Sequence, residues 1–449
     1  MSPRLPFVSA SVAATGTLVA LAAAVVLLSR ATPATARPAH GAFVACDAGN
    51  AGLTLPAGFC ATIFADKLGA ARHLTVLPNG DVFVNIRAGG GGGESPLGTG
   101  TDGGLVALRD ADGDGHAEVQ QKVAEANGTE VQVANGFVYV TNRNHVVRFP
   151  MVGDRPDASK PDTIVMNMPV GGHSAYNFVV DGRTLYLNVG SRSNSCQEKE
   201  RTPLSPGVDP CVELETRAGI WTFDANKSHQ TAADGERFAT GIRNGVSLTM
   251  NPADRTLYVV QHGRDLLFGN WAPAFTAEQS AEWPAEEFFR VTKGDNFGWP
   301  YCFYNPDLKA KVLAPEFGGD GRKTDRCTDK KLPIFAFPGH WAPNASLFYT
   351  GTQFPAKYRG GAFIAFHGSW NRAPLPQGGF KVVVLPVKDG KATAATFDVF
   401  ADGFAGPGGT PTSEGLHRPT GLAQAPDGSL YVSDDAGGRI YKISYTGGR

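Results

Sequence analysis

The sequence has few charged residues, almost no net charge and no C-x-x-C motif. Only 18% of its 449 residues are charged, and the formal net charge is −1 at pH 7. A chain without an excess of basic residues lacks a stripe that neutralises phosphates, which argues against nucleic acid as a partner. The missing C-x-x-C pair disfavours a zinc-binding or dithiol redox site.

Glycine and proline are abundant instead, with 56 and 31 copies. Both residue types occupy turns, glycine because it tolerates positive φ and proline because its φ is preset. Together with the shortage of charged residues, they favour an all-β chain that is rich in turns and poor in surface helices.

A turn followed by a short alternating strand recurs six times along the chain. Each copy joins an Asn, Asp or Gly turn to a run of Val, Leu, Tyr and Phe, the pattern of a β-hairpin arm. The six copies are Leu77–Asn85, Ala134–Asn142, Val180–Gly190, Asn251–Gln261, Gly360–Trp370 and Ala425–Asp434. Their irregular spacing, with no helical block between them, predicts a single six-bladed β-propeller domain over 45–449 with loop insertions of different lengths.

Residues 1–36 have the features of an export segment. Arg4 precedes an apolar run over 7–28, and Ala34-Thr35-Ala36 then forms an A-x-A motif. This order predicts a secretory signal peptide. Because the run is close to the length of a membrane span, an uncleaved anchor is the alternative. Either interpretation places the domain outside the cytoplasm, in the periplasm or secreted, with anchoring to the inner membrane as the variant case.

The six cysteines fall into three pairs that are local in sequence. An even number of cysteines in an exported chain favours disulfides, although six cysteines can pair in many ways. We predict local pairing, because each bond would then staple one inserted loop. The predicted pairs are Cys46–Cys60, Cys196–Cys211 and Cys302–Cys327.

Residues 110–116 resemble the start of a calcium-binding loop. Asp110, Asp112 and Asp114 place carboxylates at alternate positions, as an EF-hand does. An EF-hand requires Glu at the twelfth position, which here is Gln121. We therefore interpret the segment as an acidic hairpin turn between two strands of an early blade.

Five histidines lie near the ends of predicted strands. Loops at strand ends on one face of a propeller converge on its axis, so several of these side chains can share a pocket. Such a group supports either an acid/base site or a metal cluster. The five are His173, His262, His340, His367 and His417.

A set of short motifs in a fixed order spans about residues 55–445. The motifs are Gly58–Phe64, Leu77–Asp81, Ala239–Asn244, Gln261–Asp265, Gly294–Pro300, Phe366–Arg372, and Arg418–Gly421 leading to Pro426–Gly428. In this order they resemble the pyrroloquinoline quinone (PQQ)-dependent glucose/sorbosone dehydrogenases, six-bladed propellers among exported bacterial enzymes. The sorbosone-type branch is more similar than the soluble glucose enzymes.

The resemblance implies roles for several residues. His173 corresponds to the catalytic base that takes the proton of the C1 hydroxyl while hydride passes to the quinone. Arg243 and Asn244 match the pair that contacts the quinone oxygens, with Arg243 stabilising charge on the reduced cofactor. Gly263 and Arg264 fall where two backbone carbonyls hold a calcium ion.

The cofactor's carboxylates have fewer expected partners here than in the family. Arg418 matches one of two arginines that grip them. Asn371 stands where the glucose enzymes have a cofactor-binding Lys, with Arg372 beside it; His340 replaces a Thr, and Thr420 replaces the second Arg. Two positive charges are therefore lost from the expected site. This loss would weaken cofactor binding unless Arg372, Arg264 or His340 substitutes.

The resemblance implies an exported oxidoreductase that oxidises a sugar, an aldose or a sugar aldehyde such as sorbosone at C1. Its cofactors would be PQQ and Ca²⁺, and its electrons would pass to a soluble acceptor or to the respiratory chain. Because propellers host many functions, two alternatives stay open. One is a propeller lactonase or other hydrolase with an axial metal, and the other is a non-catalytic propeller that binds a sugar or a protein.

Overall fold

The computed structural model describes residues 46–89, 102–272, 274–408 and 415–447. The predicted signal or anchor segment, including the apolar run over 7–28, lies outside these residues. Within the described ranges, no helix has the length and apolar character needed to cross a membrane. The following description concerns the propeller alone.

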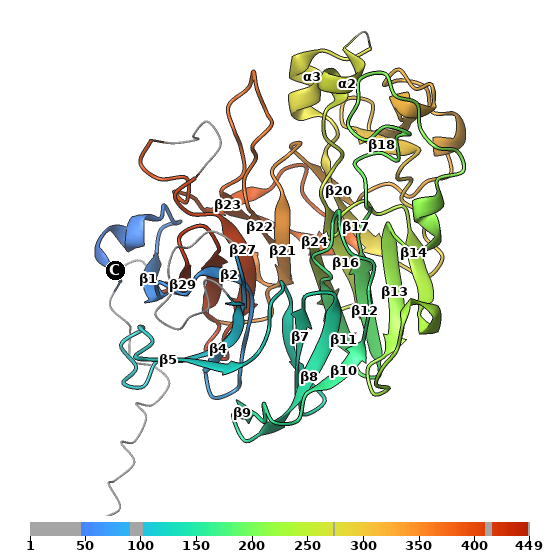
Figure 1. The fold of residues 1–449 in the computed structure, drawn as a ribbon. Helices are drawn as coiled ribbons and strands as arrows, with labels where there is room; N and C mark the ends of the chain where they lie inside the picture. Colours follow the sequence, from blue (N-terminus) through green and yellow to red (C-terminus); the bar gives the residue numbers. More distant parts are fainter. Residues whose placement is uncertain (1–45, 90–101, 273, 409–414, 448–449) are drawn as a thin grey trace, which may run out of the picture. The chain divides into compact units, whose positions relative to one another are not determined.

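Six antiparallel sheets of four main strands each form the propeller (Figure 1). Blade 1 contains β2 (Ala70–Val76), β3 (Val82–Arg87), β4 (Gly104–Arg109) and β5 (Val119–Ala124). Blade 2 contains β6 (Val131–Ala134), β7 (Phe137–Asn142), β8 (His145–Val152) and β10 (Asp162–Val165), with the short β9 (Arg155–Pro156) beside β8. Blade 3 contains β11 (Phe178–Asp181), β12 (Thr184–Val189), β13 (Gly219–Asp224) and β14 (Glu236–Thr240). Blade 4 contains β15 (Ser247–Asn251), β16 (Thr256–Gln261), β17 (Glu286–Val291) and β20 (Phe335–Phe337). Blade 5 contains β21 (Pro343–Phe348), β22 (Ala362–Phe366), β23 (Lys381–Leu385) and β26 (Asp398–Ala401). Blade 6 contains β27 (Pro419–Gln424), β28 (Leu430–Asp434), β29 (Arg439–Tyr445) and β1 (Phe59–Ala65). The prediction of a six-bladed propeller is confirmed.

The first strands of the blades form a closed circle around the axis. β2 contacts β6, and the contacts continue through β11, β15, β21 and β27 back to β2. The last blade takes its outer strand from the other end of the chain, since β1 pairs with β29 and Ala61 lies opposite Ile443. The two ends of the domain therefore meet in one blade, as expected for a propeller.

Five of the six predicted hairpin arms contain the whole second strand of a blade, and Leu77–Asn85 contains most of β3. In β12, Leu185, Leu187 and Val189 pack toward blade 2, whereas Tyr186 packs on the opposite face against Phe238. Successive side chains of a strand point to opposite faces, so a strand that is apolar on both faces becomes buried between neighbouring blades. Six apolar clusters fill the six spaces between blades in this way.

Blade 4 carries two insertions. The loop between β16 and β17 contains α2 (Leu267–Trp271) and α3 (Ala277–Glu282), and the segment between β17 and β20 contains a hairpin of β18 (Cys302–Asn305) with β19 (Ala310–Leu313). Figure 1 shows α2, α3 and β18 together at one end of the propeller. A buried ion pair of 2.5 Å between Lys311 and Glu287 ties the hairpin to β17. The remaining short elements are the hairpin β24 (Val387–Lys388) with β25 (Lys391–Ala392) and the 3-10 helices Ala48–Gly52, Val212–Glu215, Ala232–Asp234, Pro315–Phe317, Asp325–Cys327 and Ala356–Tyr358.

Three disulfides staple loops of this domain. They join Cys46 to Cys60, Cys196 to Cys211, and Cys302 to Cys327. All three predicted pairs are confirmed. The second and third hold insertions that meet in one small apolar cluster, which also contains Trp299 and Leu313.

The order of the strands decides which loops meet at the axis. In a blade of four antiparallel strands, the turns between strands 1 and 2 lie at one end. The loops between strands 2 and 3, and those that lead into the next blade, lie at the other end. We call this second end the loop face. Its loops carry the histidines singled out in the sequence, so the topology alone gathers them on one side of the propeller.

Phe59 provides a test of ring closure. It lies on β1 and makes edge-to-face contacts with Phe354, Tyr358 and Phe400 of blade 5. Phe59→Ala should lower the free energy of unfolding by about 3–5 kcal/mol, because it leaves a cavity where β1 closes the ring. Urea unfolding measures this loss. Phe268→Ala, at a side chain that is 43% exposed, is the matched control; equal losses in both variants would contradict the importance of this contact.

Candidate active site

A cavity of about 690 Å³ lies on the axis at the loop face, within the range of roughly 300–1,000 Å³ typical of small-molecule sites. We call it the axial cavity. All six blades or the loops leading into them contribute to its wall. Prominent lining residues are Arg72, Arg87, Thr129, Arg143, His173, Tyr176, Asn244, His262, Asn344, His367 and Asp435. Three of the five predicted histidines thus share one pocket.

His173 lies in the loop before β11 and lines the axial cavity. Its Nδ1 is 3.0 Å from the carbonyl oxygen of Ser191 and 2.9 Å from the Ser191 hydroxyl, which itself donates to the carbonyl of Ser193. A carbonyl can only accept, so Nδ1 carries the proton. The unprotonated Nε2 makes no hydrogen bond to any residue that the structure describes.

The surroundings of His173 keep its ring neutral. Burial, followed by the positive charge of Arg243, holds the pKa of His173 well below its ordinary value of 6.5. The same two causes lower the pKa of His262 to about 4, and His262 Nε2 donates to the carbonyl of Pro343 at 3.0 Å. Burial is thus the larger cause of the neutral ring and the charge of Arg243 the second.

Backbone hydrogen bonds join the loops that carry these groups. Ser191 N donates to the carbonyl of Arg243, and His262 N donates to the carbonyl of Asn244. Gln261 accepts from Arg243 N through its side-chain oxygen at 2.9 Å. These bonds fix the relative positions of blades 3 and 4 at the site.

Arg243 and Asn244 point to different places. The Asn244 side chain lines the axial cavity, and its buried Oδ1 has no hydrogen-bond partner among the described residues. Arg243 is only 3% exposed and lies behind the wall, where it donates to the carbonyl of Gly263 at 2.7 Å and to Asn194. The resemblance implies that Arg243 contacts the cofactor together with Asn244, but the Arg243 guanidinium lies outside the described lining of the axial cavity and acts on His173 through its charge.

Asp265 is the centre of a buried polar cluster beside the axial cavity. It pairs with Arg243 at 3.0 Å and Arg201 at 2.9 Å, and it accepts from Asn371 at 2.9 Å. His340 Nδ1 lies 3.7 Å from it. Although burial alone would raise it, the pKa of Asp265 is held well below 3.8 by Arg243 and His340. Asp265 thus gathers three of the residues that the sequence assigned to the cofactor.

The other basic residues predicted for the cofactor are engaged outside the axial cavity. Arg264 pairs with buried Glu316, and Arg372 pairs with Glu282 and donates to three backbone carbonyls. Arg418 donates to the carbonyls of His367 and Gly368. The three candidate substitutes for the missing charges, Arg372, Arg264 and His340, are not among the described lining residues of the axial cavity.

Sequence reasoning missed four charged residues of the axial cavity, Arg72, Arg87, Arg143 and Asp435. Asp435 pairs with Arg72 and accepts from His367 Nε2 at 2.7 Å. Arg87 ends the second strand of blade 1, and Asp435 follows the second strand of blade 6, the same strand-end position that His262 and His367 occupy. Extending the search at this position from histidine to every charged residue would have found both.

Glu286, at the start of β17, is buried beneath the site. Its carboxylate accepts from Gly263 N at 2.7 Å and from Ala342 N at 3.1 Å. Burial raises its pKa from 4.5 to about 7. The side chain therefore links the loop after β16 to the loop before β21.

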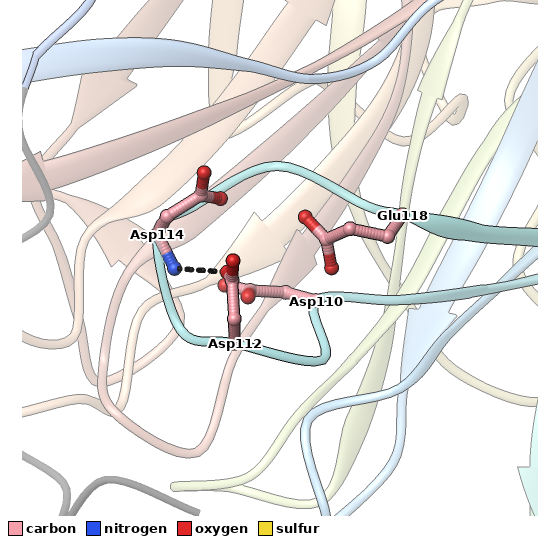
Figure 2. A group of neighbouring side chains, drawn as sticks. All are labelled: Asp110, Asp112, Asp114 and Glu118. Atoms are coloured by element: carbon pink, nitrogen blue, oxygen red, sulfur yellow. Dashed lines mark hydrogen bonds between the residues drawn. The ribbon is translucent and has the colours of Figure 1, made fainter.

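The acidic segment over 110–118 is a hairpin loop between β4 and β5 of blade 1, as predicted. Figure 2 shows Asp110, Asp112, Asp114 and Glu118 around this loop, and their ligand atoms lie within 4.8 Å of one another. The fourth carboxylate comes from Glu118 rather than from the EF-hand position of Gln121. The loop lies on an outer hairpin and not among the residues of the axial cavity.

The comparison with known families agrees with this architecture. A family model described as TrAA12-like matches residues 53–446. The chain belongs to the TrAA12-like family.

Individual relatives support the resemblance. The TrAA12-like chain is 30% identical over 277 residues to an uncharacterized protein of Borreliella burgdorferi, covering 61% of each chain. It is 25% identical over 283 residues to the pyrroloquinoline quinone-dependent pyranose dehydrogenase of Coprinopsis cinerea, covering 55% of this chain and 38% of that protein. The matches thus span between 38% and 61% of these two relatives. The holo pyranose dehydrogenase PQQ domain from Coprinopsis cinerea has a TM-score of 0.69 at 19% identity, covering 90% of this chain and 100% of that domain, and so shares the fold.

Glu286 predicts a pH dependence of stability. Its pKa is higher in the folded chain than the 4.5 of an exposed carboxyl, so its stabilising contribution is full below pH 4.5 and is lost as the pH rises to about 7. Glu286→Gln stays neutral at every pH. The stability gap between wild type and this variant should therefore shrink by roughly 3 kcal/mol from pH 4.5 to 8. Urea unfolding at several pH values measures the gap; a constant gap would contradict the raised pKa.

Proposed function

We propose that the protein is an exported PQQ-dependent dehydrogenase that oxidises a sugar or sugar aldehyde at C1. The observation that supports this most is His173, a neutral imidazole whose free Nε2 belongs to an axial cavity of suitable size. The related Coprinopsis cinerea enzyme is a PQQ-dependent pyranose dehydrogenase. Sorbosone-like sugar aldehydes are included in the proposed substrate class because of the motif resemblance.

The axial cavity suits a cofactor with several carboxylates. Arg72, Arg87 and Arg143 contribute positive charge to its lining, whereas Asp435 is the one carboxylate among the described lining residues. Asn244 offers an amide whose Oδ1 lacks a partner. These residues would hold PQQ, which when bound supplies an acceptor for the hydride of the sugar C1.

His173 would act as the general base. A C1 hydroxyl beside Nε2 would lose its proton to this nitrogen, because Nδ1 already carries one. Ser191 keeps this tautomer, since its carbonyl accepts from Nδ1. Arg243 keeps the ring neutral before the reaction, and the amide of Asn244 would orient the bound groups.

Calcium at Gly263 and Arg264 does not fit the geometry of this site. The Gly263 carbonyl accepts a hydrogen bond of 2.7 Å from the cationic Arg243 guanidinium. A cation bound to that oxygen would meet Arg243 at close range, and like charges repel strongly in a buried site. The proposed reaction therefore includes no step at these carbonyls.

An extracytoplasmic location is part of the proposal. The three disulfides among the described residues favour an oxidising compartment. Electrons from the reduced cofactor would pass to an acceptor outside the protein. A hydrolase with an axial metal is less well supported, because Asp435 is already bonded to Arg72 and His367.

Replacement of His173 tests the base. His173→Ala should lower kcat by about 10²–10⁴-fold, the usual contribution of a general base, with PQQ binding largely retained. Dye reduction with glucose, other aldoses and sorbosone measures turnover, and absorbance titration measures PQQ binding. His229→Asn, at an exposed loop position, is the control and should match the wild type. Unchanged sugar oxidation in His173→Ala would refute the assignment.

The protonation state of His173 gives a separate prediction. Its pKa is depressed, so the unprotonated base persists as the pH falls through 6.5 and is lost only at lower pH. The acid limb of kcat/KM should therefore lie clearly below pH 6.5. Arg243→Gln removes one cause of the depression and should move this limb to higher pH. A limb at or above pH 6.5 in the wild type would contradict the neutral base.

A further inference from the structure

Two arginines of blade 1 contribute positive charge to the axial cavity. Arg72 comes from β2 and Arg87 from the end of β3, and both belong to the lining. Neither corresponds to a cofactor residue that the motif resemblance identifies. Arg72 is 94% buried, with 6% of its surface exposed.

Only some of the hydrogen-bond donors of the Arg72 guanidinium have a partner. One of its terminal nitrogens pairs with Asp435, which also accepts from His367. Its Nε is buried and has no hydrogen-bond partner among the described residues. A guanidinium has five N–H donors, so the contact with Asp435 leaves donors for a further acceptor.

The Arg87 side chain has no hydrogen bond or ion pair with any residue that the structure describes. Arg72 and Arg87 lie close together, because the register of β2 and β3 places Ala70 opposite Arg87 and Ala71 opposite Ile86. The charge of Arg72 is accordingly the largest cause that lowers the pKa of Arg87. Asp435 offsets this repulsion only in part. A pair of close cations with one counterion gains stability when an anion binds between them.

We propose that Arg72 and Arg87 form a carboxylate-binding subsite of the axial cavity. The inference rests on the proposed function and deepens it. The chain has Asn371 and Thr420 where the resemblance expects two cations, and Arg264, Arg372 and His340 are engaged elsewhere. Arg72 and Arg87 place two positive charges on another part of the wall.

The carboxylate could come from two sources. A carboxylate of PQQ would bind here if the two arginines compensate for the missing cations. The carboxylate of an acidic sugar, such as a uronic acid, would bind here if the subsite selects the substrate. Charge-assisted bidentate pairing of Arg with a carboxylate is the shared chemistry.

Direct binding to the apoprotein tests the subsite. PQQ binding is followed by absorbance, and binding of pyridine-2,6-dicarboxylate, which cannot accept electrons, is followed by calorimetry. Arg87→Gln should weaken the affected ligand by about tenfold to a hundredfold, the value of a hydrogen bond to a charged group. Arg87→Lys keeps the charge and should lose less. Arg183→Gln removes an exposed arginine that pairs with Asp224 far along blade 3 and should bind like the wild type.

Kinetics distinguish the two sources. A weaker PQQ affinity in Arg87→Gln, with an unchanged ratio of glucuronate to glucose kcat/KM, identifies the cofactor carboxylate. An unchanged PQQ affinity with a reduced ratio identifies the substrate carboxylate. If PQQ affinity, dicarboxylate affinity and the ratio all match those of Arg183→Gln, the subsite is refuted. The wild type could also bind the dicarboxylate but no PQQ. If Arg87→Gln then weakens dicarboxylate binding, the subsite is supported and the proposed function is refuted.

Discussion

The pairing of β1 with β29 is the constraint on which the rest of the structure depends. β1 comes from the start of the domain and completes the blade formed by its last strands. Without it, blade 6 would have an open edge and its apolar face toward blade 5 would lose Phe59 and Ala61. Closure fixes the circle of inner strands, and only a closed circle directs the loops of six separate blades to one axis.

Burial then determines the charge states at the loop face. Asp265 remains ionised because Arg243 and Arg201 compensate its charge. Glu286 has no cationic partner at hydrogen-bond distance among the described residues, and burial raises its pKa. The positive charge of Arg243 acts on two neighbouring groups. It neutralises Asp265 and, by its proximity, keeps His173 unprotonated. A neutral base therefore coexists with a strongly charged cluster a short distance away.

The fold was predictable because its determinants are local. Turn residues and two-sided apolar alternation, as in β12, mark a buried strand wherever they occur, and six such arms indicate six blades. The disulfides were predictable for the same reason, since Cys196 and Cys211 bracket one loop. The site was only partly predictable. The resemblance indicated that His173 and Asn244 lie in one pocket, but the direction of the Arg243 side chain depends on Asn194 and Asp265, which belong to two other loops.

Charge compensation explains why motif comparison is weakest at such a site. A motif assigns a role to a position, whereas a bound anion responds to the sum of charges around it. Asn371 and Thr420 each lack the positive charge that the glucose enzymes have at the same position. The sum also includes Arg72 and Arg87, which come from strands of blade 1 that no cofactor motif covers. Because the closed ring brings blade 1 beside blade 6, a cation lost from one blade can be replaced from another without changing the fold. The total charge that surrounds a ligand in the axial cavity is therefore a property of the whole ring and not of any single motif.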